Sequence, residues 1–291
     1  MGTRVRFVKG HGTENDFVLL PDLDGELDLT PEWVAAICDR RAGIGADGIL
    51  RVVPTALAQA AAYAPQARWF MDYRNADGSL AQMCGNGIRV FARYLVDHYL
   101  EAPGEFTIAT RGGVRTVRLG VTGDVTVDMG PAGFPDTGPV TVRVGGRSWP
   151  AVAVTMPNPH AVVFVDELGH AGDLLVAPSV DPPGAFPEGV NVEFVVARGP
   201  RHVAMRVHER GVGETRSCGT GACAVMAAAA RRDGEAAPVT YRVDVPGGRL
   251  EIVECADGRV EMTGPAELIA EGELLPLSVG DGQGGRATLA G

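Results

Sequence analysis

The chain has 291 residues, 45% of them apolar, which is enough for one large domain or for two of ordinary size. Its formal net charge of −10, with no basic stripe, argues against a nucleic-acid-binding protein. No apolar run is long enough to cross a bilayer, and the segment MGTRVRFVKGHG lacks the apolar region of a signal peptide, so a cytoplasmic location is expected and a membrane partner is not.

Glycine and proline are abundant, with 40 and 20 copies, and they predict many short elements joined by turns. Six runs alternate in polarity or are rich in β-branched residues, which predicts strands at 116–121, 125–130, 140–145, 161–167, 190–197 and 202–209. Helical patterns are fewer and cover 31–41, 85–99 and 219–231. The chain is therefore expected to combine many strands with few helices.

The two halves of the chain repeat the same order of features. The first half contains GTENDFVLL, RAGIGADGI, ARWFMDYR and NADGSLAQMCGNG; the second contains MPNPHAVVF, PEGVNVEFV, HVAMRVHE and RGVGETRSCGTG. Each series has an Asn-bearing turn, a Gly-bearing turn, a strand, and then Cys-Gly-x-Gly at the start of a helix. Such self-similarity predicts that one β-rich lobe has been duplicated.

The five cysteines indicate neither a disulfide framework nor a metal site. They are odd in number, they form no CxxC pair, and no His/Cys cluster has zinc spacing. Two of them begin the predicted second and third helices. The other three are interpreted as small apolar side chains that fill the interior, at Cys38, Cys223 and Cys255.

Cys84 and Cys218 are the candidate catalytic residues. The positive end of a helix dipole favours a thiolate, so the pKa of each thiol is expected to fall, and the first N–H groups of the helix can bind a carboxylate. Two facing thiols could remove the α-proton of an amino acid from one face and return a proton to the other, which is racemisation or epimerisation. Lys9 is the only lysine and has no phosphate-loop context, so pyridoxal phosphate is not expected and no cofactor is predicted.

The segments NADGSLAQMCGNG and ERGVGETRSCGTGA together resemble the diaminopimelate epimerase family, and the resemblance runs from Phe7 to about Ala266. It implies a cofactor-independent isomerase that interconverts LL- and meso-2,6-diaminopimelate in the synthesis of lysine and peptidoglycan precursors. The implied fold is α+β, with two pseudo-symmetric lobes, each a mostly antiparallel sheet curled around a central helix. Residues 1–128 with 264–291 would form the lobe that carries Cys84, residues 129–263 the lobe that carries Cys218, and the active site would lie in the cleft between them.

The resemblance also implies roles for individual residues. Cys84 and Cys218 would be the two proton-transfer thiols, and His160 and Glu209 would modulate their pKa values. The groups implied to bind the substrate are Asn15, Asn75, Asn158, Asn191, Glu209 and Arg210, with the backbone N–H groups of Gly85, Asn86, Gly219 and Thr220. Arg210 suits the distal carboxylate, because a guanidinium binds a carboxylate with two parallel hydrogen bonds.

Two positions depart from the family pattern. Gly48 stands where many members have Gln, and Ala270 stands where some members have an aromatic residue used in dimer contact, so a homodimer is expected less firmly. The alternatives are a two-cysteine racemase of proline or hydroxyproline, an epimerase of another basic amino acid, and, from a different class, a non-catalytic thiol redox sensor. Isomerases of the phenazine-biosynthesis type share the fold but lack the thiol pair.

Overall fold

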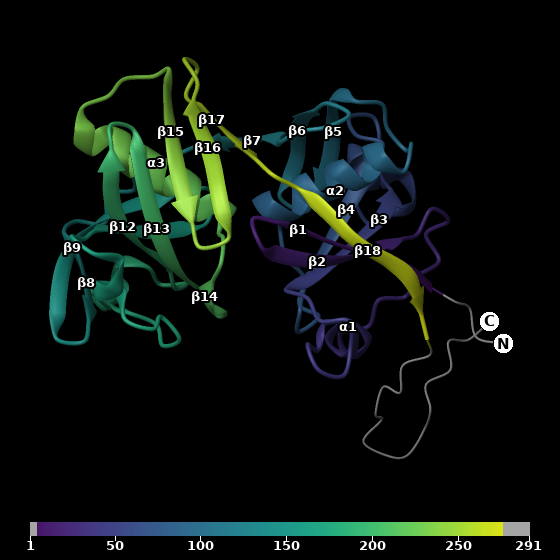
Figure 1. The fold of residues 1–291 in the computed structure, drawn as a ribbon, viewed down its shortest axis with the longest axis horizontal. Helices are drawn as coiled ribbons and strands as arrows, with labels where there is room; N and C mark the ends of the chain where they lie inside the picture. The colour runs from purple at the N-terminus through teal and green to yellow at the C-terminus, as the bar shows by residue number, and fades with distance from the viewer. Residues whose placement is uncertain (1–4, 276–291) are drawn as a thin grey trace. The chain divides into compact units, whose positions relative to one another are not determined.

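The structure is a computed structural model that describes residues 5–275 (Figure 1). The chain forms two compact units. Unit 1 consists of the described residues up to Gly12, of Asp16–Val125 and of the described residues from Ala266 onward, and unit 2 consists of Thr13–Asn15 and Thr126–Pro265. Residues 276–291, which the sequence assigned to the N-terminal lobe, lie outside the described residues.

Unit 1 is a curled sheet with a buried helix, α2 (Gly85–Asp97), in which every residue except the last is buried. The helix contacts strands on several sides, namely β1 (Val5–Gly12), β3 (Gly48–Pro54), β4 (Trp69–Asn75), β6 (Gly113–Leu119) and β18 (Glu267–Leu274). The remaining elements are β2 (Asn15–Pro21), α1 (Pro31–Cys38), the short helices η1 (Thr55–Leu57) and η2 (Ala61–Tyr63), and β5 (Gly104–Thr110).

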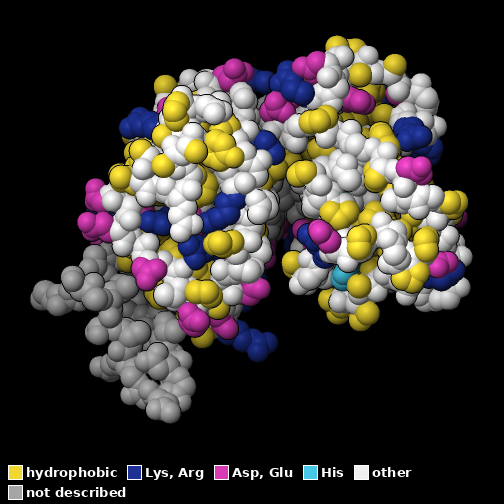
Figure 2. Space-filling model, turned by 180° about the vertical axis from the view of Figure 1, so that it is seen from behind, with side chains coloured by type: hydrophobic (Ala, Val, Ile, Leu, Met, Phe, Trp, Pro, Cys, Tyr) yellow, Lys and Arg dark blue, Asp and Glu magenta, His cyan; other side chains and the backbone are white. Residues whose placement is uncertain are grey.

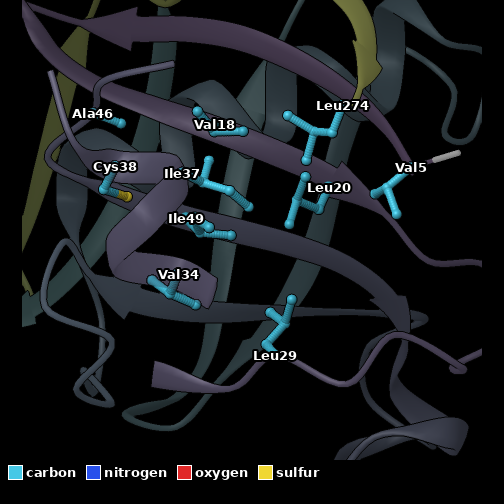
Figure 3. Packing of buried hydrophobic residues seen from close by; sticks show 10 residues of the cluster. All are labelled: Val5, Val18, Leu20, Leu29, Val34, Ile37, Cys38, Ala46, Ile49 and Leu274. Atoms are coloured by element: carbon cyan, nitrogen blue, oxygen red, sulfur yellow. The ribbon is translucent and has the colours of Figure 1, made fainter. Parts of the chain in front are cut away.

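Besides the residues around α2, unit 1 has a hydrophobic core under α1. Thr30 caps this helix, because its side chain accepts a hydrogen bond from the backbone N–H of Trp33, and Pro31 occupies the first turn. The buried side chains of the helix pack on strand residues from β1, β2, β3 and β18 (Figure 3). Figure 3 shows Ile37 directed toward Val18 and Ile49. Cys38 belongs to this cluster and is 4% exposed, as expected for an apolar filler.

Unit 2 has the same plan around α3 (Gly219–Asp233), whose run of alanines supplies small side chains that strands can approach closely. The helix contacts β9 (Arg147–Thr155), β10 (Pro159–Phe164), β12 (Asn191–Gly199), β13 (His202–Glu209), β15 (Val239–Val245), β16 (Gly248–Glu254) and β17 (Arg259–Gly264). The other elements are β7 (Val125–Pro131), β8 (Val140–Val144), η3 (Leu168–Ala171), β11 (Ser179–Asp181), η4 (Pro183–Ala185) and β14 (Gly213–Thr215).

The order of strand pairing confirms the repeat predicted from the sequence. In unit 1, β2 pairs parallel with β3, β3 pairs antiparallel with β4, and β4 pairs parallel with β5 across α2. In unit 2, β10, β12, β13 and β15 follow the same sequence of pairings across α3. Most of the other pairings are antiparallel, so the fold is α+β with two lobes, each built around one helix.

The surface carries charges of both signs. On the face drawn in Figure 2, the Lys and Arg side chains are interspersed with Asp and Glu side chains and with hydrophobic ones. Within residues 5–275, no helix has both the length and the apolar character that a membrane span requires.

Candidate active site

Cys84 and Cys218 each cap the helix of their unit, as predicted. Both have extended backbone angles, with φ −137° and ψ 121° for Cys84 and φ −121° and ψ 112° for Cys218. The Sγ of Cys84 accepts a hydrogen bond from the N–H of Gly87 at 3.4 Å, and the Sγ of Cys218 accepts one from Gly221 at 3.3 Å. The two thiols therefore occupy equivalent positions in the repeated fold, at the positive ends of α2 and α3.

In unit 1, the segment that leads to Cys84 is folded back on the end of β4. Asn75 is the last residue of this strand, and its side-chain amide donates to the hydroxyl of Ser79 at 3.0 Å. Further along, the backbone N–H of Gly112 donates to the carbonyl of Gln82 at 2.8 Å. Arg111 donates to the Tyr73 carbonyl at 2.9 Å and to the Asp72 carboxylate at 2.5 Å, and it also reaches the Ala81 carbonyl in this segment at 3.5 Å.

A buried guanidinium lies under the first turn of α2. Arg89 is 0% exposed, and its Nη1 donates to the side-chain oxygen of Asn86 at 3.0 Å and to the carbonyl of Gly85 at 3.4 Å. A methyl group on Gly12 would lie 2.9 Å from Nη2 of the same arginine, so a side chain there would displace the guanidinium. Arg89 was not predicted as a site residue, although its place within the apolar helical run 88–96 was the available signal.

In unit 2, the strand register gathers several candidate residues on one face of the sheet. His160 lies opposite Asn191 in the parallel pair β10–β12, and Glu209 ends β13 beside the same position. Because side chains two residues apart point to the same face, Glu193 shares this face with them, as does Thr215 of β14. The alternate residues, among them Ala161, Val163, Val192 and Phe194, form the apolar core on the other face.

Hydrogen bonds connect these side chains into two groups. The Nδ1 of His160 lies 2.6 Å from the Oε1 of Glu193, and its Nε2 lies 2.9 Å from the Oδ1 of Asn158. The Oδ1 of Asn191 accepts a hydrogen bond from the backbone N–H of Arg210 at 2.8 Å. Arg210 itself is exposed and also donates to the carbonyl of Glu188 at 2.7 Å, so its side chain is held at the rim of the unit.

Glu209 belongs to the same site. Its carboxylate accepts a hydrogen bond from the Thr215 hydroxyl. Burial raises the pKa of Glu209, and the hydrogen bonds from Thr215 and Cys218 oppose this only in part. Glu209 is therefore close enough to Cys218 to act on the thiol directly.

The expectation that both cysteine pKa values fall is wrong for Cys218. Burial raises the pKa of this thiol well above its ordinary value, since the residue is only 5% exposed, and the charges of Glu209 and Glu193 raise it further. Hydrogen bonds from Thr220 and from the N–H of Gly221 act in the opposite direction and are outweighed. The raised pKa favours the thiol form of Cys218 over the thiolate.

Asn15 belongs to unit 2, although the strand that it begins lies in unit 1. It follows Thr13 and Glu14, which have φ of 51° and 60°. The hydroxyl of Thr13 lies 2.6 Å from the hydroxyl of Ser217, the residue before Cys218, and Glu14 forms an ion pair with Arg216. These contacts place the turn that carries Asn15 beside the segment that carries the second thiol.

Gly48 has no room for a side chain. A methyl group there would lie 2.4 Å from the carbonyl oxygen of Arg74 and 2.8 Å from Cε2 of Tyr73, because Gly48 pairs with Asn75 at the start of β3. The Gln of many family members therefore cannot be placed here without moving the strand. Ala270 lies exposed in β18, opposite Lys9 of β1.

The contacts of Lys9 and of the cysteines outside the two helix caps indicate structural roles. The ammonium of Lys9 binds the carboxylate of Asp16 and the carbonyl of Gly45, so it ties β1, β2 and the turn before β3 together. Cys223 is fully buried in α3, as expected. Cys255 is only partly buried, which corrects the expectation of an interior position, because it lies in the turn after β16. Among the described residues, no cluster of three His, Cys, Asp or Glu side chains could hold a metal ion.

A family model described as Diaminopimelate epimerase matches residues 7–135 and 152–269. The chain belongs to the diaminopimelate epimerase family. The matched ranges include both thiol-capped helices. A diaminopimelate epimerase of Streptomyces coelicolor is 63% identical over 280 residues, which cover 94% of this chain and 96% of the relative. A diaminopimelate epimerase of Mycolicibacterium smegmatis is 49% identical over 287 residues, covering 93% and 97%.

Solved structures share the fold at much lower identity. A Bacillus anthracis phenazine biosynthesis protein of the PhzF family has a TM-score of 0.69 at 16% identity, covering 94% of this chain and 99% of its own. A hydroxyproline epimerase from Agrobacterium vitis has a TM-score of 0.68 at 14% identity and covers 94% of each chain. The lobe architecture of the epimerase family therefore extends to proteins of other names, and function must be argued from the site.

Proposed function

We propose that this chain interconverts LL- and meso-2,6-diaminopimelate by proton transfer at the α-carbon, with Cys84 and Cys218 as the two bases and without a cofactor. The observation that carries the proposal is the pair of thiol-capped helices at equivalent positions of a repeated fold, in a member of the diaminopimelate epimerase family. One thiol would serve each face of the α-carbon, in a cleft between the lobes.

The proton balance of the reaction requires the two cysteines to begin in different states. As a thiolate, one takes the α-proton and the C–H bond breaks; as a thiol, the other gives its proton to the opposite face and a new C–H bond forms. Since burial and the charge of Glu209 favour the thiol form of Cys218, Cys218 is the donor in a turnover that starts from this form and Cys84 is the acceptor. The two residues exchange states at the end, and the reverse reaction uses the exchanged form.

The helix starts would bind the reacting carboxylate through the backbone N–H groups of Gly85, Asn86, Gly219 and Thr220. These groups would also stabilise the negative charge that develops on the carboxylate as the α-proton leaves. At the distal end of the substrate, Arg210 would bind the second carboxylate and Glu209 would face the ammonium group. The amides that fix the orientation would be those of Asn15, Asn75, Asn158 and Asn191, which add no competing base.

The decisive experiment measures incorporation of solvent deuterium at the α-carbon of LL-diaminopimelate, proline and lysine, assayed side by side without added cofactor. We expect exchange and epimerisation with diaminopimelate alone. Cys84→Ala and Cys218→Ala should each lower the epimerisation rate by about 100-fold or more, because each removes one proton-transfer group.

The matched control is Cys255→Ala, which removes a thiol outside both helices and should keep the rate. Exchange into proline or lysine would assign a different substrate. Full activity in both active-site variants under reducing conditions would remove the cysteines from the mechanism, and a complete lack of exchange would favour the redox-sensor alternative.

A cytoplasmic location and a homodimer stay predictions from the family. Cell fractionation tests the first, and analytical ultracentrifugation of the purified chain tests the second. A dimer would not depend on an aromatic contact at Ala270, because the exposed alanine there offers little area.

A further inference from the structure

Glu193 is a buried acidic residue that neither the sequence motifs nor the proposed mechanism assigns. It lies in β12 within the run 191–196, in which every residue is buried, and its side chain is 0% exposed. Placing a carboxylate in such surroundings is costly unless other groups compensate the charge. A side chain kept there has a role that an apolar residue would not fill.

The two carboxylate oxygens of Glu193 have different surroundings. Oε1 lies 2.6 Å from the Nδ1 of His160. Oε2 is buried and has no hydrogen-bond partner among the residues that the structure describes. One oxygen is therefore anchored by the imidazole, and the other keeps its full hydrogen-bonding capacity in a closed space.

The first turn of α3 brings this carboxylate close to the thiol. A methyl group on Gly221 would lie 2.8 Å from the Oε1 of Glu193 and 3.2 Å from the Sγ of Cys218, so the two atoms are at most the sum of these distances, about 6 Å, apart. Glycine at position 221 thus lets a carboxylate and a thiol share the same helix start. In unit 2 the titratable groups that face Cys218 are Glu209 of β13, Glu193 of β12 and, behind Glu193, His160 of β10.

The hydrogen bonds of His160 show how the carboxylate is held. Both ring nitrogens face oxygen atoms, Nδ1 that of Glu193 and Nε2 that of Asn158. Because a carboxylate oxygen can only accept, Nδ1–H of His160 donates to Glu193 and holds that carboxylate in place, while the Asn158 amide contacts the other ring nitrogen.

We propose that Glu193 is a positioning residue that keeps the proton on the Cys218 thiol, and that His160 is the anchor that holds the carboxylate beside it. This inference rests on the proposed function, because it assigns Cys218 as the proton donor of that reaction. The negative charge of Glu193 disfavours a second negative charge on sulfur until the substrate takes the proton. His160 keeps the charge close to the sulfur, because its 2.6 Å contact fixes the carboxylate.

The test is the rate at which iodoacetamide alkylates Cys218 in the full chain at pH 8, followed by mass spectrometry, since only the thiolate reacts. Glu193→Gln keeps the shape and removes the charge, and it should raise the rate about tenfold. His160→Gln can still donate to Glu193 and keep the carboxylate in place, so it should also stay within about threefold of the original rate. Glu193→Asp keeps the charge and should stay within about threefold of the original rate.

The matched control is Glu235→Gln, which removes a carboxylate of unit 2 at the far end of α3, where the backbone N–H of Glu235 bonds to Ala230. It should leave the alkylation rate unchanged. Equal rises in Glu193→Gln and Glu193→Asp would show loosened packing and overturn the charge argument, as would a rise in His160→Gln. If Glu193→Gln does not fold, His160→Leu decides: it removes the donor that holds the carboxylate and should raise the rate, and an unchanged rate would overturn the proposal.

The alkylation experiment needs no substrate, so it is independent of the assay for the proposed function. A chain without epimerase activity would refute that function while the thiol measurement still stood. An active chain in which Glu193→Gln leaves the alkylation of Cys218 unchanged would refute this inference alone.

Discussion

Gly221 and Gly87 allow the same substitution to be compared at equivalent positions of the two helices. Each is the third residue of its helix and donates its N–H to the capping thiol. A methyl group on Gly221 would lie 2.8 Å from the Oε1 of Glu193, whereas one on Gly87 would first meet the Cδ2 of Leu50 at 3.3 Å. Gly221→Ala must therefore displace a buried carboxylate, and Gly87→Ala needs a shift of only a few tenths of an ångström.

The expected magnitudes follow from three terms. Replacing Gly by Ala in a helix stabilises it by about 1 kcal/mol in both units. At position 221 the displaced Glu193 also weakens its 2.6 Å hydrogen bond to His160, and a hydrogen bond to a charged group contributes about 1.5–3 kcal/mol. The small shift at Gly87 costs a fraction of 1 kcal/mol. Gly221→Ala should thus be less stable than Gly87→Ala by about 2 kcal/mol.

The assay is urea unfolding followed by circular dichroism, with the free energy of unfolding obtained from the midpoint and slope. Gly87→Ala should unfold at the same urea concentration as the unmodified chain or at a higher one, and Gly221→Ala at a lower one. Equal midpoints for the two variants, or a higher midpoint for Gly221→Ala, would refute the claim that Glu193 is held rigidly against the start of α3.

Three further predictions concern unit 1. Burial would raise the pKa of Asp16, but hydrogen bonds and charges of Arg40 and Lys9 lower it from 3.8 to about 2. Because the pKa is depressed in the folded state, Asp16→Asn should lose about 2 kcal/mol of stability at pH 7. In urea titrations this difference from the unmodified chain should disappear as the pH falls from about 4 to 2. Asp72 is 3% exposed and forms ion pairs with three arginine side chains. Asp72→Asn should therefore lower the free energy of unfolding by about 3–5 kcal/mol in the same assay. The control is Asp77→Asn, at an exposed position, which should have a near-zero effect. Gly48→Gln should cost about 1–3 kcal/mol of stability, because the new side chain meets the backbone of β4. The KM for diaminopimelate should not fall. A lower KM would show that the strand moves and lets the new side chain contact the substrate.

The local features of the site were predictable from the sequence because they depend on a few neighbouring residues. Cys-Gly-x-Gly ahead of an apolar or alanine-rich run specifies a cap followed by a helix, and both helices begin at the predicted residue. Alternating β-branched runs gave strands whose ends differ from the prediction by a few residues, as at β12, where the predicted 190–197 is Asn191–Gly199. The repeated order of motifs predicted two lobes of one plan.

The electrostatic state of the site was not predictable in this way. The helix dipole argues for a thiolate at Cys218, yet the pKa of this thiol rises, because strands from distant parts of the chain bury it and place Glu193 and Glu209 beside it. In the sequence, nothing distinguishes Glu193 from other polar residues of predicted strands. Only the register of β12 with β10 shows that it lies on the same face as His160, next to α3. Arg89 lies in an apolar helical run, but the burial of its guanidinium under Asn86 depends on the close approach of Gly12 at the end of β1.

The sequence by itself determined the two capped helices, the repeat and the family of this chain, since capping geometry and motif order are written in short contiguous segments. The tertiary structure alone decided that the pKa of the Cys218 thiol rises, why Gly221 and Gly48 must lack a side chain, and which acids lie next to Cys218. Those properties depend on burial and on charges a few ångströms apart in space, and they are set only when strands separated by tens of residues pack on one helix start.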